Sequence, residues 1–599
     1  MAGQGIGTQR TLPELFYFFA KILGPEKSFY SLAIIYGVGI SLLSLATPIS
    51  VQMLINSIIN TGLTTPLFVL SATLFVLLAL AAVMNALRLH LVDVFGRRFY
   101  ARMVSEIALR SVYALNPYFD DRGIGPLFNR YFDIIIVMKR TPYLLVGGFS
   151  ILLQAAVGFA LTSLYHPAFL AFNLVVIILI WLIWLIWGKR AIKSAMQLSH
   201  DKHSAAAWLE GLGSSNGYFK SSSHVEEALR RTDDVTNTYI EQHKLHFRHY
   251  FSQAVSFLFL WALASSGLLA LGGWLVIQSQ LSVGQLVAAE LVLSAVFFGL
   301  SQLGTYLSYF YDLCAAVEEL SLFYDVEQEE VKGTDEKLPG SGLAMVEARG
   351  ETRGIDIAFN LELPPSALVY ARAPSYAVQR LFANFMKRHA EPDGGYVTIG
   401  GVDTHSVSAH SLRQEIIVLD RPNTTSMTIR DYLTRSRDGV NSVDILEVLR
   451  LVGLEPVIAQ LENGLDHQIA VTGWPLSLAE MMQLKLASAI LARPRVLVLS
   501  QLYDVLPYRL LMSALAALHE SAETETTIVY FSNREPTGDF SHFLYMGRSQ
   551  QRVFSDSVSF CEHFDMRVME RTRSEHGDIH AQRYQSPFLG TGTEVATND

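Results

Sequence analysis

The stretch Val369–Phe382 (VYARAPSYAVQRLF) lies where a phosphate-binding loop is expected but lacks the residues that bind phosphate. Such a loop reads G-x-x-x-x-G-K-[ST] between a strand and a helix. Its glycines let backbone N–H groups surround the phosphates, its lysine contacts the β- and γ-phosphates, and its hydroxyl holds Mg²⁺. Here the apolar run Ala367–Ala371 predicts the strand, and Val378–Met386 predicts the helix. The frame of the loop is therefore present.

The chemical groups of the loop are missing from the matching positions. Ala373, Tyr376 and Val378 stand where glycines are needed. Gln379 replaces the lysine, and Arg380 replaces the hydroxyl. Cβ atoms at glycine positions resist a positive φ and intrude on the phosphate space. Because glutamine carries no charge and arginine cannot ligate a metal, the sequence predicts that this loop does not bind Mg²⁺-ATP.

Composition indicates a large membrane protein. The chain has 599 residues, too many for one core, so at least two domains are expected. Hydrophobic residues make up 50% and charged residues 17%, below the roughly 25% of soluble domains. The net charge of −9 argues against nucleic acid as a partner. Cys314 and Cys561 give neither a metal spacing nor a disulfide framework.

The N-terminal half contains six apolar runs of the length that crosses a bilayer. They are Phe29–Leu54, Leu67–Leu91, Tyr143–Tyr165, Ala168–Trp187, Phe251–Ile277 and Val283–Leu307. Pro167 predicts a break between the third and fourth runs. The connections after the second and fourth runs are long and basic, whereas the others lack Lys and Arg. The positive-inside rule therefore places the long connections and both termini in the cytoplasm. Before the first run, Leu12–Leu23 is amphipathic and is expected to form a short helix, either along the membrane surface or leading into the first span.

The long basic connections are predicted to be helical stalks. Gly96–Leu115 and Ala191–Leu212 are rich in helix formers and contain no proline. Short polar pieces interrupt them at Asn116–Gly125 and Gly211–Ser223, where Gly and Ser favour helix ends. We expect the stalks to carry these two pieces into the cytoplasm, where they can contact another domain.

Histidines on the stalks raise the question of a metal site. His243, His246 and His249 do not share a narrow helical face, so a solvated stalk surface is expected for them. His200 and His203 share a face better, but ordinary stalk polarity is also the preferred interpretation there. No metal site is predicted.

After an acidic linker the pattern changes to an α/β domain. Asp325–Ser341 contains Gly and Pro and has no apolar period. Strands are then predicted at Ala367–Ala371, Glu415–Leu419, Arg495–Leu499 and Thr527–Phe531. Helices are predicted at Val378–Arg388, Val443–Val452, Leu478–Ala492 and Leu510–Glu520. Because strands alternate with helices, a parallel sheet is expected.

This organisation resembles the ATP-binding cassette (ABC) exporters from about Leu12 to Asp565. The segment PYFDDR at Pro117–Arg122 looks like the family's first coupling helix, and LSVGQLVA at Leu281–Ala288 looks like the start of its sixth span. The resemblance implies a multidomain membrane protein: an all-α, six-span transmembrane domain with cytoplasmic stalks, then an α/β P-loop-NTPase-like nucleotide-binding domain. The expected divisions are an amphipathic elbow (1–28), transmembrane domain (29–324), linker (325–341), nucleotide-binding domain (342–570) and flexible tail (571–599).

The family's other nucleotide-site positions are also altered. By resemblance, its Mg²⁺-sensing glutamine falls at Asp420, its switch histidine at Asn533, and the Asp of its dimer loop at Pro507. Its Asp-Glu pair falls at Ser500 and Gln501. Ser500 offers no carboxylate to hold Mg²⁺, and Gln501 offers none to polarise an attacking water.

The family's signature LSGGQ reads LSLAE here. Leu476 and Ser477 are kept, Leu478 and Ala479 replace the two glycines, and Glu480 replaces the glutamine. The bulk of the replacements hinders close approach of a partner's γ-phosphate, and the glutamate adds negative charge near it. The spacing of Ser477 and Glu480 favours a helix-capping box over a ligand role.

Together these positions predict a pseudo-ATPase half of an exporter-like complex, with no enzymatic activity and no cofactor of its own. ATP and Mg²⁺ are expected only if a partner subunit contributes to their binding. The expected partner is a second half-transporter chain, with a heterodimer favoured and a homodimer left open. Alternatives are a non-transporting membrane scaffold or regulator and an ATP-independent homodimeric transporter. The resemblance implies an integral multi-pass protein of a bacterial inner membrane, in contact with the bilayer and not with nucleic acid.

Overall fold

The computed structural model describes residues 10–44, 46–47, 49–51, 53, 65–115, 119, 125–330, 333–352, 354–520, 525–537 and 539–563. The chain divides into two compact units, Met1–Gln328 and Glu329–Asp599. The expected tail at 571–599 lies outside the described residues, as does most of the segment Pro117–Arg122.

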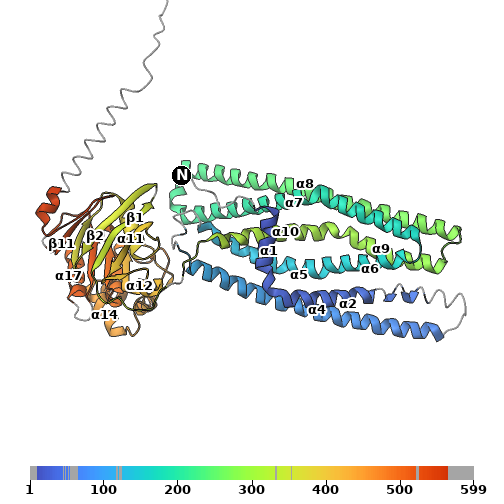
Figure 1. Ribbon diagram of the computed structural model, residues 1–599, viewed down its shortest axis with the longest axis horizontal. Helices are drawn as coiled ribbons and strands as arrows, with labels where there is room; N and C mark the ends of the chain where they lie inside the picture. The colour runs from blue at the N-terminus through green and yellow to red at the C-terminus, as the bar shows by residue number, and fades with distance from the viewer. Residues whose placement is uncertain are drawn as a thin grey trace, which may run out of the picture. The chain divides into compact units, whose positions relative to one another are not determined.

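The first unit is built from long helices (Figure 1). They are α1 (Leu12–Leu23), α2 (Lys27–Ser44), α4 (Thr65–Val112), α5 (Asp133–Pro142), α6 (Phe149–Ser163), α7 (Pro167–Ser214), α8 (Ser222–Ile277), α9 (Val283–Ser301) and α10 (Leu303–Ser321). A 3₁₀ segment (Gly125–Phe132) precedes α5, and a π-helical segment, η4 (Tyr143–Gly148), joins α5 to α6. Helices α7 and α8 lie side by side (Figure 1).

Within the described part of the chain, five helical segments are long and apolar enough to cross a membrane. They are Leu67–Val112, Pro126–Ser163, Pro167–Ser214, Ser222–Ile277 and Val283–Asp325. These segments cover the second to sixth predicted spans, except that the third ends at Ser163 instead of Tyr165. The first predicted span, Phe29–Leu54, lies partly outside the described residues, so six spans stay a prediction. The predicted break is confirmed, because α6 ends at Ser163 and His166 caps α7 by accepting a hydrogen bond from the Ala168 N–H group at 3.1 Å.

The predicted stalk helices are also present. Helix α4 continues without a break to Val112, and α7 continues to Ser214. Between α7 and α8 the chain turns in a short 3₁₀ helix, Asn216–Lys220, at the second predicted cross-piece. Helix α1 matches the predicted amphipathic stretch, buries Leu15, Phe18 and Ile22, and crosses the long helices in Figure 1.

Not all of the stalk histidines lie on the polar stalk surface that was expected. His203 is 5% exposed, and its Nε2 lies 2.5 Å from the Oδ2 atom of buried Asp133. Lys202 Nζ contacts the other oxygen of Asp133 at 2.8 Å. Among the other three histidines, His243 is exposed, whereas His246 bonds the Ser194 hydroxyl at 3.0 Å. The i, i+3 spacing was visible in the sequence, but the facing carboxylate on α5 was not.

A second buried ion cluster joins α7 to α10. His200 Nε2 lies 3.1 Å from Glu318 Oε1, and Arg130 Nε donates to Glu319 Oε2 at 2.6 Å. Both glutamates are fully buried. Potential metal-ligand atoms of His200, Glu318 and Glu319 lie within 4.8 Å of one another. Because Arg130 already neutralises one carboxylate, the cluster is an ion-pair network.

The second unit contains a six-stranded sheet of order β12-β11-β3-β10-β9-β6 and a four-stranded sheet of order β2-β1-β4-β5. The strands are β1 (Leu343–Thr352), β2 (Ile355–Leu363), β3 (Leu368–Arg372), β4 (Gly394–Ile399), β5 (Val402–Asp403), β6 (Ile416–Leu419), β7 (Met427–Thr428), β8 (Gln468–Ile469), β9 (Val496–Leu499), β10 (Thr527–Phe531), β11 (His542–Met546) and β12 (Gln551–Phe554). The helices are α11 (Tyr376–Met386), α12 (Ala409–Glu415), α13 (Ile429–Thr434), α14 (Ser442–Leu451), α15 (Glu455–Gln460), α16 (Leu478–Ala492) and α17 (Tyr508–His519).

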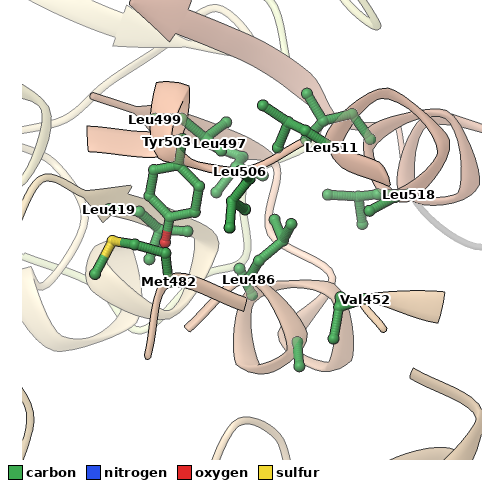
Figure 2. Packing of buried hydrophobic residues seen from close by; sticks show 14 of the residues in the cluster. Leu419, Val452, Met482, Leu486, Leu497, Leu499, Tyr503, Leu506, Leu511 and Leu518 are labelled. Atoms are coloured by element: carbon green, nitrogen blue, oxygen red, sulfur yellow. The ribbon is translucent and has the colours of Figure 1, made fainter. Parts of the chain in front are cut away.

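The predicted parallel sheet is confirmed, because β3, β10, β9 and β6 pair in parallel. Figure 2 shows part of the core beneath one edge of this sheet, where Tyr503 lies among Leu419, Leu499 and Met482. This apolar packing holds the ends of β6 and β9 close together. The loops that follow these two strands carry the positions of the candidate site.

Candidate functional site

The loop after β3 is short and leads directly into α11. It comprises Ala373–Ser375, and the helix begins at Tyr376 rather than at Val378 as the sequence predicted. The earlier start has a local cause, because Ser375 is the N-cap residue and its hydroxyl accepts a hydrogen bond from the Ala377 N–H group at 3.3 Å. A serine cap therefore takes up part of the chain that would form an open phosphate loop.

The backbone amides of this first helical turn are already bonded. The Val378 and Gln379 N–H groups both donate to the Ser375 carbonyl oxygen, at 3.1 and 3.5 Å. In a phosphate-binding loop the amides at the helix N-terminus are directed at the anion. The side chains of Val378 and Gln379 are buried, whereas Tyr376 is 44% exposed. The glutamine at the lysine position therefore lies within the fold.

The end of β9 offers no carboxylate at the two metal and water positions. Ser500 is 4% exposed, and its hydroxyl accepts a hydrogen bond from the Leu502 N–H group at 3.4 Å. Its own N–H group donates to the Leu419 carbonyl oxygen at 3.1 Å. Gln501 starts the short helix η8 (Gln501–Val505). Ser500 thus acts as a helix cap at the position where a metal ligand would lie.

Asp504 links the segment after β9, which leads to Pro507, to the segment after β10 around Asn533, here called the switch segment. Sequence reasoning missed this role of Asp504. Its Oδ1 accepts hydrogen bonds from the Ser532 hydroxyl, at 2.7 Å, and from the Tyr530 hydroxyl. Its Oδ2 accepts from the Asn533 N–H group at 3.0 Å. Arg534 strengthens the link, because its Nη2 donates to the carbonyl oxygens of Asp504 and, at 2.6 Å, Leu506. Both carboxylate oxygens of Asp504 are therefore engaged.

A hydrogen bond also connects the switch segment to β3, the strand before the predicted phosphate loop. Arg372, the last residue of β3, donates from Nη2 to the Asn533 carbonyl oxygen at 3.4 Å. The side chain of Asn533 itself is at an exposed position. Hydrogen bonds between protein groups thus connect the three segments.

Asp420, at the glutamine-loop position, lies among partly buried cations. Burial raises the pKa of Asp420, while Arg421, Lys387 and Lys485 oppose that rise. Burial also lowers the pKa of Lys387 and lowers the pKa of Lys485 to about 8. Lys485 Nζ donates to the carbonyl oxygens of Arg421 and Asn423, at 2.6 and 2.7 Å. A lysine from α16 therefore holds this loop in place. A charged residue inside the apolar pattern LKLASAIL was the available signal.

The signature segment forms the predicted capping box. The Glu480 carboxylate accepts from the Ser477 N–H group at 2.7 Å, and the Ser477 hydroxyl accepts from the Glu480 N–H group at 3.4 Å. Leu476 is buried, and Ala479 packs against the core. Leu478 is 49% exposed. Both polar side chains are therefore used to start α16.

The described residues at these positions do not form the donor set of a magnesium–nucleotide complex. They supply no loop lysine, no metal-binding hydroxyl after it and no Asp-Glu pair at the end of β9. Arg380 contributes positive charge near the loop, but a guanidinium is not a metal ligand. The arrangement is instead a set of internal hydrogen bonds and ion pairs.

Sequence comparison finds transporters along most of the chain. The ABC multidrug transporter mdr2 of Aspergillus fumigatus is 25% identical over 542 residues, covering 85% of this chain and 67% of that protein. A multidrug resistance ABC transporter ATP-binding and permease protein of Lactococcus lactis is 22% identical, with 83% and 85% covered. The ABC transporter ATP-binding protein YwjA of Bacillus subtilis is 25% identical over 271 residues, and there the match spans 46% of the relative. No protein-family model matches the chain.

Structure comparison gives the same architecture. A bacterial Atm1-family ABC exporter, solved with ATP bound, superposes with a TM-score of 0.77 and 16% sequence identity. The superposition covers 92% of this chain and 98% of the exporter chain. With its apolar helices, this fold indicates an integral membrane protein. The chain thus has the fold of an ABC exporter half-transporter and is similar in sequence to transporters of that family.

Proposed function

We propose that this chain is a non-catalytic half of an exporter-like membrane complex. It supplies transport-path helices and a docking surface to a second half-transporter chain, and it neither binds nor hydrolyses Mg²⁺-ATP at its own loop. A partner with an intact loop is favoured over a homodimer. Both termini are proposed to lie in the cytoplasm, at a bacterial inner membrane.

The observation that best supports this proposal is that the first backbone N–H groups of α11 donate their hydrogen bonds to Ser375. A working loop gains affinity from amides, a lysine and metal ligands, and each charge-assisted hydrogen bond contributes about 1.5–3 kcal/mol. Micromolar binding corresponds to about 8 kcal/mol in total. Losing several of these contributions together therefore removes most of the affinity. In a dimer, the partner's loop would face Leu478 and Glu480, a bulky side chain and a carboxylate in place of glycine and glutamine.

Equilibrium binding of radiolabelled Mg²⁺-ATP to the purified chain tests the proposal. The chain alone is expected to show no saturable binding at millimolar nucleotide, while an exporter half with an intact loop binds in the same assay. Gln379→Lys is expected not to restore binding, because the amides stay bonded to Ser375 and the lysine would start from a buried position. Micromolar binding by the wild-type chain would reject the pseudo-ATPase proposal, and rescue by the single substitution would reject its steric part.

A further inference from the structure

A cavity of about 720 Å³ lies in the first unit between α4, α5, η4 and α10. Three cationic side chains line it: Arg88 and Arg97 from α4 and Lys139 from α5. Among the described lining residues the carboxylate is that of Asp93, which pairs with Arg97 at 2.8 Å. Three cations against one carboxylate leave the cavity with an excess of positive charge.

Two of these cations have no carboxylate to pair with among the described residues. Arg88 Nε is buried and has no hydrogen-bond partner there, and no ion pair involves Lys139. The adjacent Arg140 shows the contrast, since it pairs with Asp312 at 3.0 Å and lies over the Tyr309 ring at 4.2 Å. A buried guanidinium N–H group without an acceptor costs free energy, so Arg88 is a candidate ligand-binding group.

The rest of the lining is apolar and aromatic. It includes Leu89 and Val92 from α4, Met138 from α5, and Val146 and Tyr143 from η4, with Tyr100 and Tyr306. Glycines bring the walls together, because a Cβ on Gly147 would lie 2.5 Å from the Tyr306 hydroxyl oxygen. A Cβ on Gly96 would lie 3.3 Å from Met138 Cγ. Short π-helical segments such as η4 are frequent at functional sites.

The depth of the cavity places its cations near one membrane surface. Arg88 lies at the end of the predicted span Leu67–Leu91, about 30 Å along the helix from Leu67. That length matches the hydrocarbon thickness of a bilayer. Because the basic connection after this span is predicted to be cytoplasmic, these cations lie at the level of cytoplasmic lipid headgroups.

We infer that this cavity binds an amphipathic anion, with a phosphate-like head on Arg88 and Lys139 and an apolar tail along the Leu89, Val92 and Val146 wall. Anionic lipids of the cytoplasmic leaflet are attracted to basic pockets between membrane helices. A soluble amphipathic phosphate has the same chemistry, and the experiment separates the two sources. The inference concerns binding without nucleotide, so it does not depend on whether the second unit binds ATP.

Native mass spectrometry of the purified full-length chain in detergent provides the test. Phosphatidylglycerol, phosphatidylcholine and dodecyl phosphate are titrated separately, without nucleotide. Phosphatidylglycerol is expected to bind at least tenfold more tightly than phosphatidylcholine. Arg88→Gln is expected to weaken that binding about tenfold, the size of one lost charge-assisted bond. Lys189→Gln, an exposed cation at the end of the apolar part of α7, is the matched control and is expected to change nothing.

Further outcomes of these titrations also decide the matter. If the chain binds dodecyl phosphate but not phosphatidylglycerol, and Arg88→Gln loses the dodecyl phosphate binding, the site is supported and its ligand is a soluble one. Equal binding of the two lipids, or wild-type binding by both Arg88→Gln and Lys139→Gln, overturns the inference. Tyr143→Cys gives a further readout: its labelling by a thiol reagent should be slowed by the bound anion. Efficient disulfide cross-linking of that cysteine to a second copy would assign the cavity to the chain interface and also overturn the inference.

Discussion

Replacing Asp504 with alanine tests whether protein contacts, rather than a metal and nucleotide, hold the segments around β9 and β10 together. The substitution removes the acceptor for two hydroxyls and the Asn533 N–H group. Hydrogen bonds to a charged group contribute about 1.5–3 kcal/mol each, but they are not additive, and the Asp504 side chain is 21% exposed. We therefore expect a loss of about 3 kcal/mol in the free energy of unfolding of the second unit.

Differential scanning fluorimetry of the full chain in detergent provides the readout. For a unit of this size, about 3 kcal/mol lowers the Tm by about 6–10 °C. Asp504→Asn should cost less, because the amide oxygen can still accept from the Asn533 N–H group while the hydroxyls reorient. Glu447→Ala, at an exposed position on α14, is the control and should stay within about 0.5 kcal/mol. A Tm loss for Asp504→Ala that appears only with Mg²⁺ present would refute the reasoning, since it would make Asp504 a metal ligand.

Three further predictions concern the same unit. Burial lowers the pKa of Lys485 to about 8, whereas an unfolded lysine titrates near 10.4, so the unfolded chain holds more protons between these values and stability rises with pH there. Between pH 8 and pH 10.4, the free energy of unfolding of the wild type, measured in thermal melts relative to Lys485→Met, should rise by about 2–3 kcal/mol. A difference between the two proteins that does not change with pH would contradict this. Ser477→Ala should destabilise the second unit by about 1 kcal/mol in urea unfolding while Ser477→Thr does not, and equal midpoints for all three proteins would argue against the cap. Ser500→Asp combined with Gln501→Glu should release no phosphate from ATP above background, because the loop before α11 is unchanged; Mg²⁺-dependent turnover would show that loop to be competent.

Short-range patterns predicted most of the elements that frame the site. The buried runs at β9 and β10 are continuous and apolar, and the Ser477–Glu480 spacing gave the start of α16, so both were readable from adjacent residues. The four-stranded antiparallel sheet was not predicted, although IDIAFNLEL in β2 alternates with the period of a strand. Its partner β1 carries an irregular register near Ala348, which weakens the alternation there.

The sequence predicted which nucleotide-binding residues the site lacks, but not the contacts that take their place. Absent residues can be read from positions such as Gln379, because the frame around them is intact. The compensating contacts join residues far apart in sequence, such as Lys485 with Arg421, and only packing brings them together. Ser375 is an exception, since a serine before a helical pattern is a local cap signal and could have given the earlier start of α11.

We propose that the loop before α11 does not hold a metal-bound triphosphate. A cryo-electron microscopy map of the full chain in a lipid nanodisc, prepared with saturating Mg²⁺-ATP, tests this claim. We predict a continuous helix from Tyr376, with Ser375 capping it and no nucleotide density beside Gln379. A map with magnesium-bound nucleotide between Gln379 and Ser500 would contradict the claim.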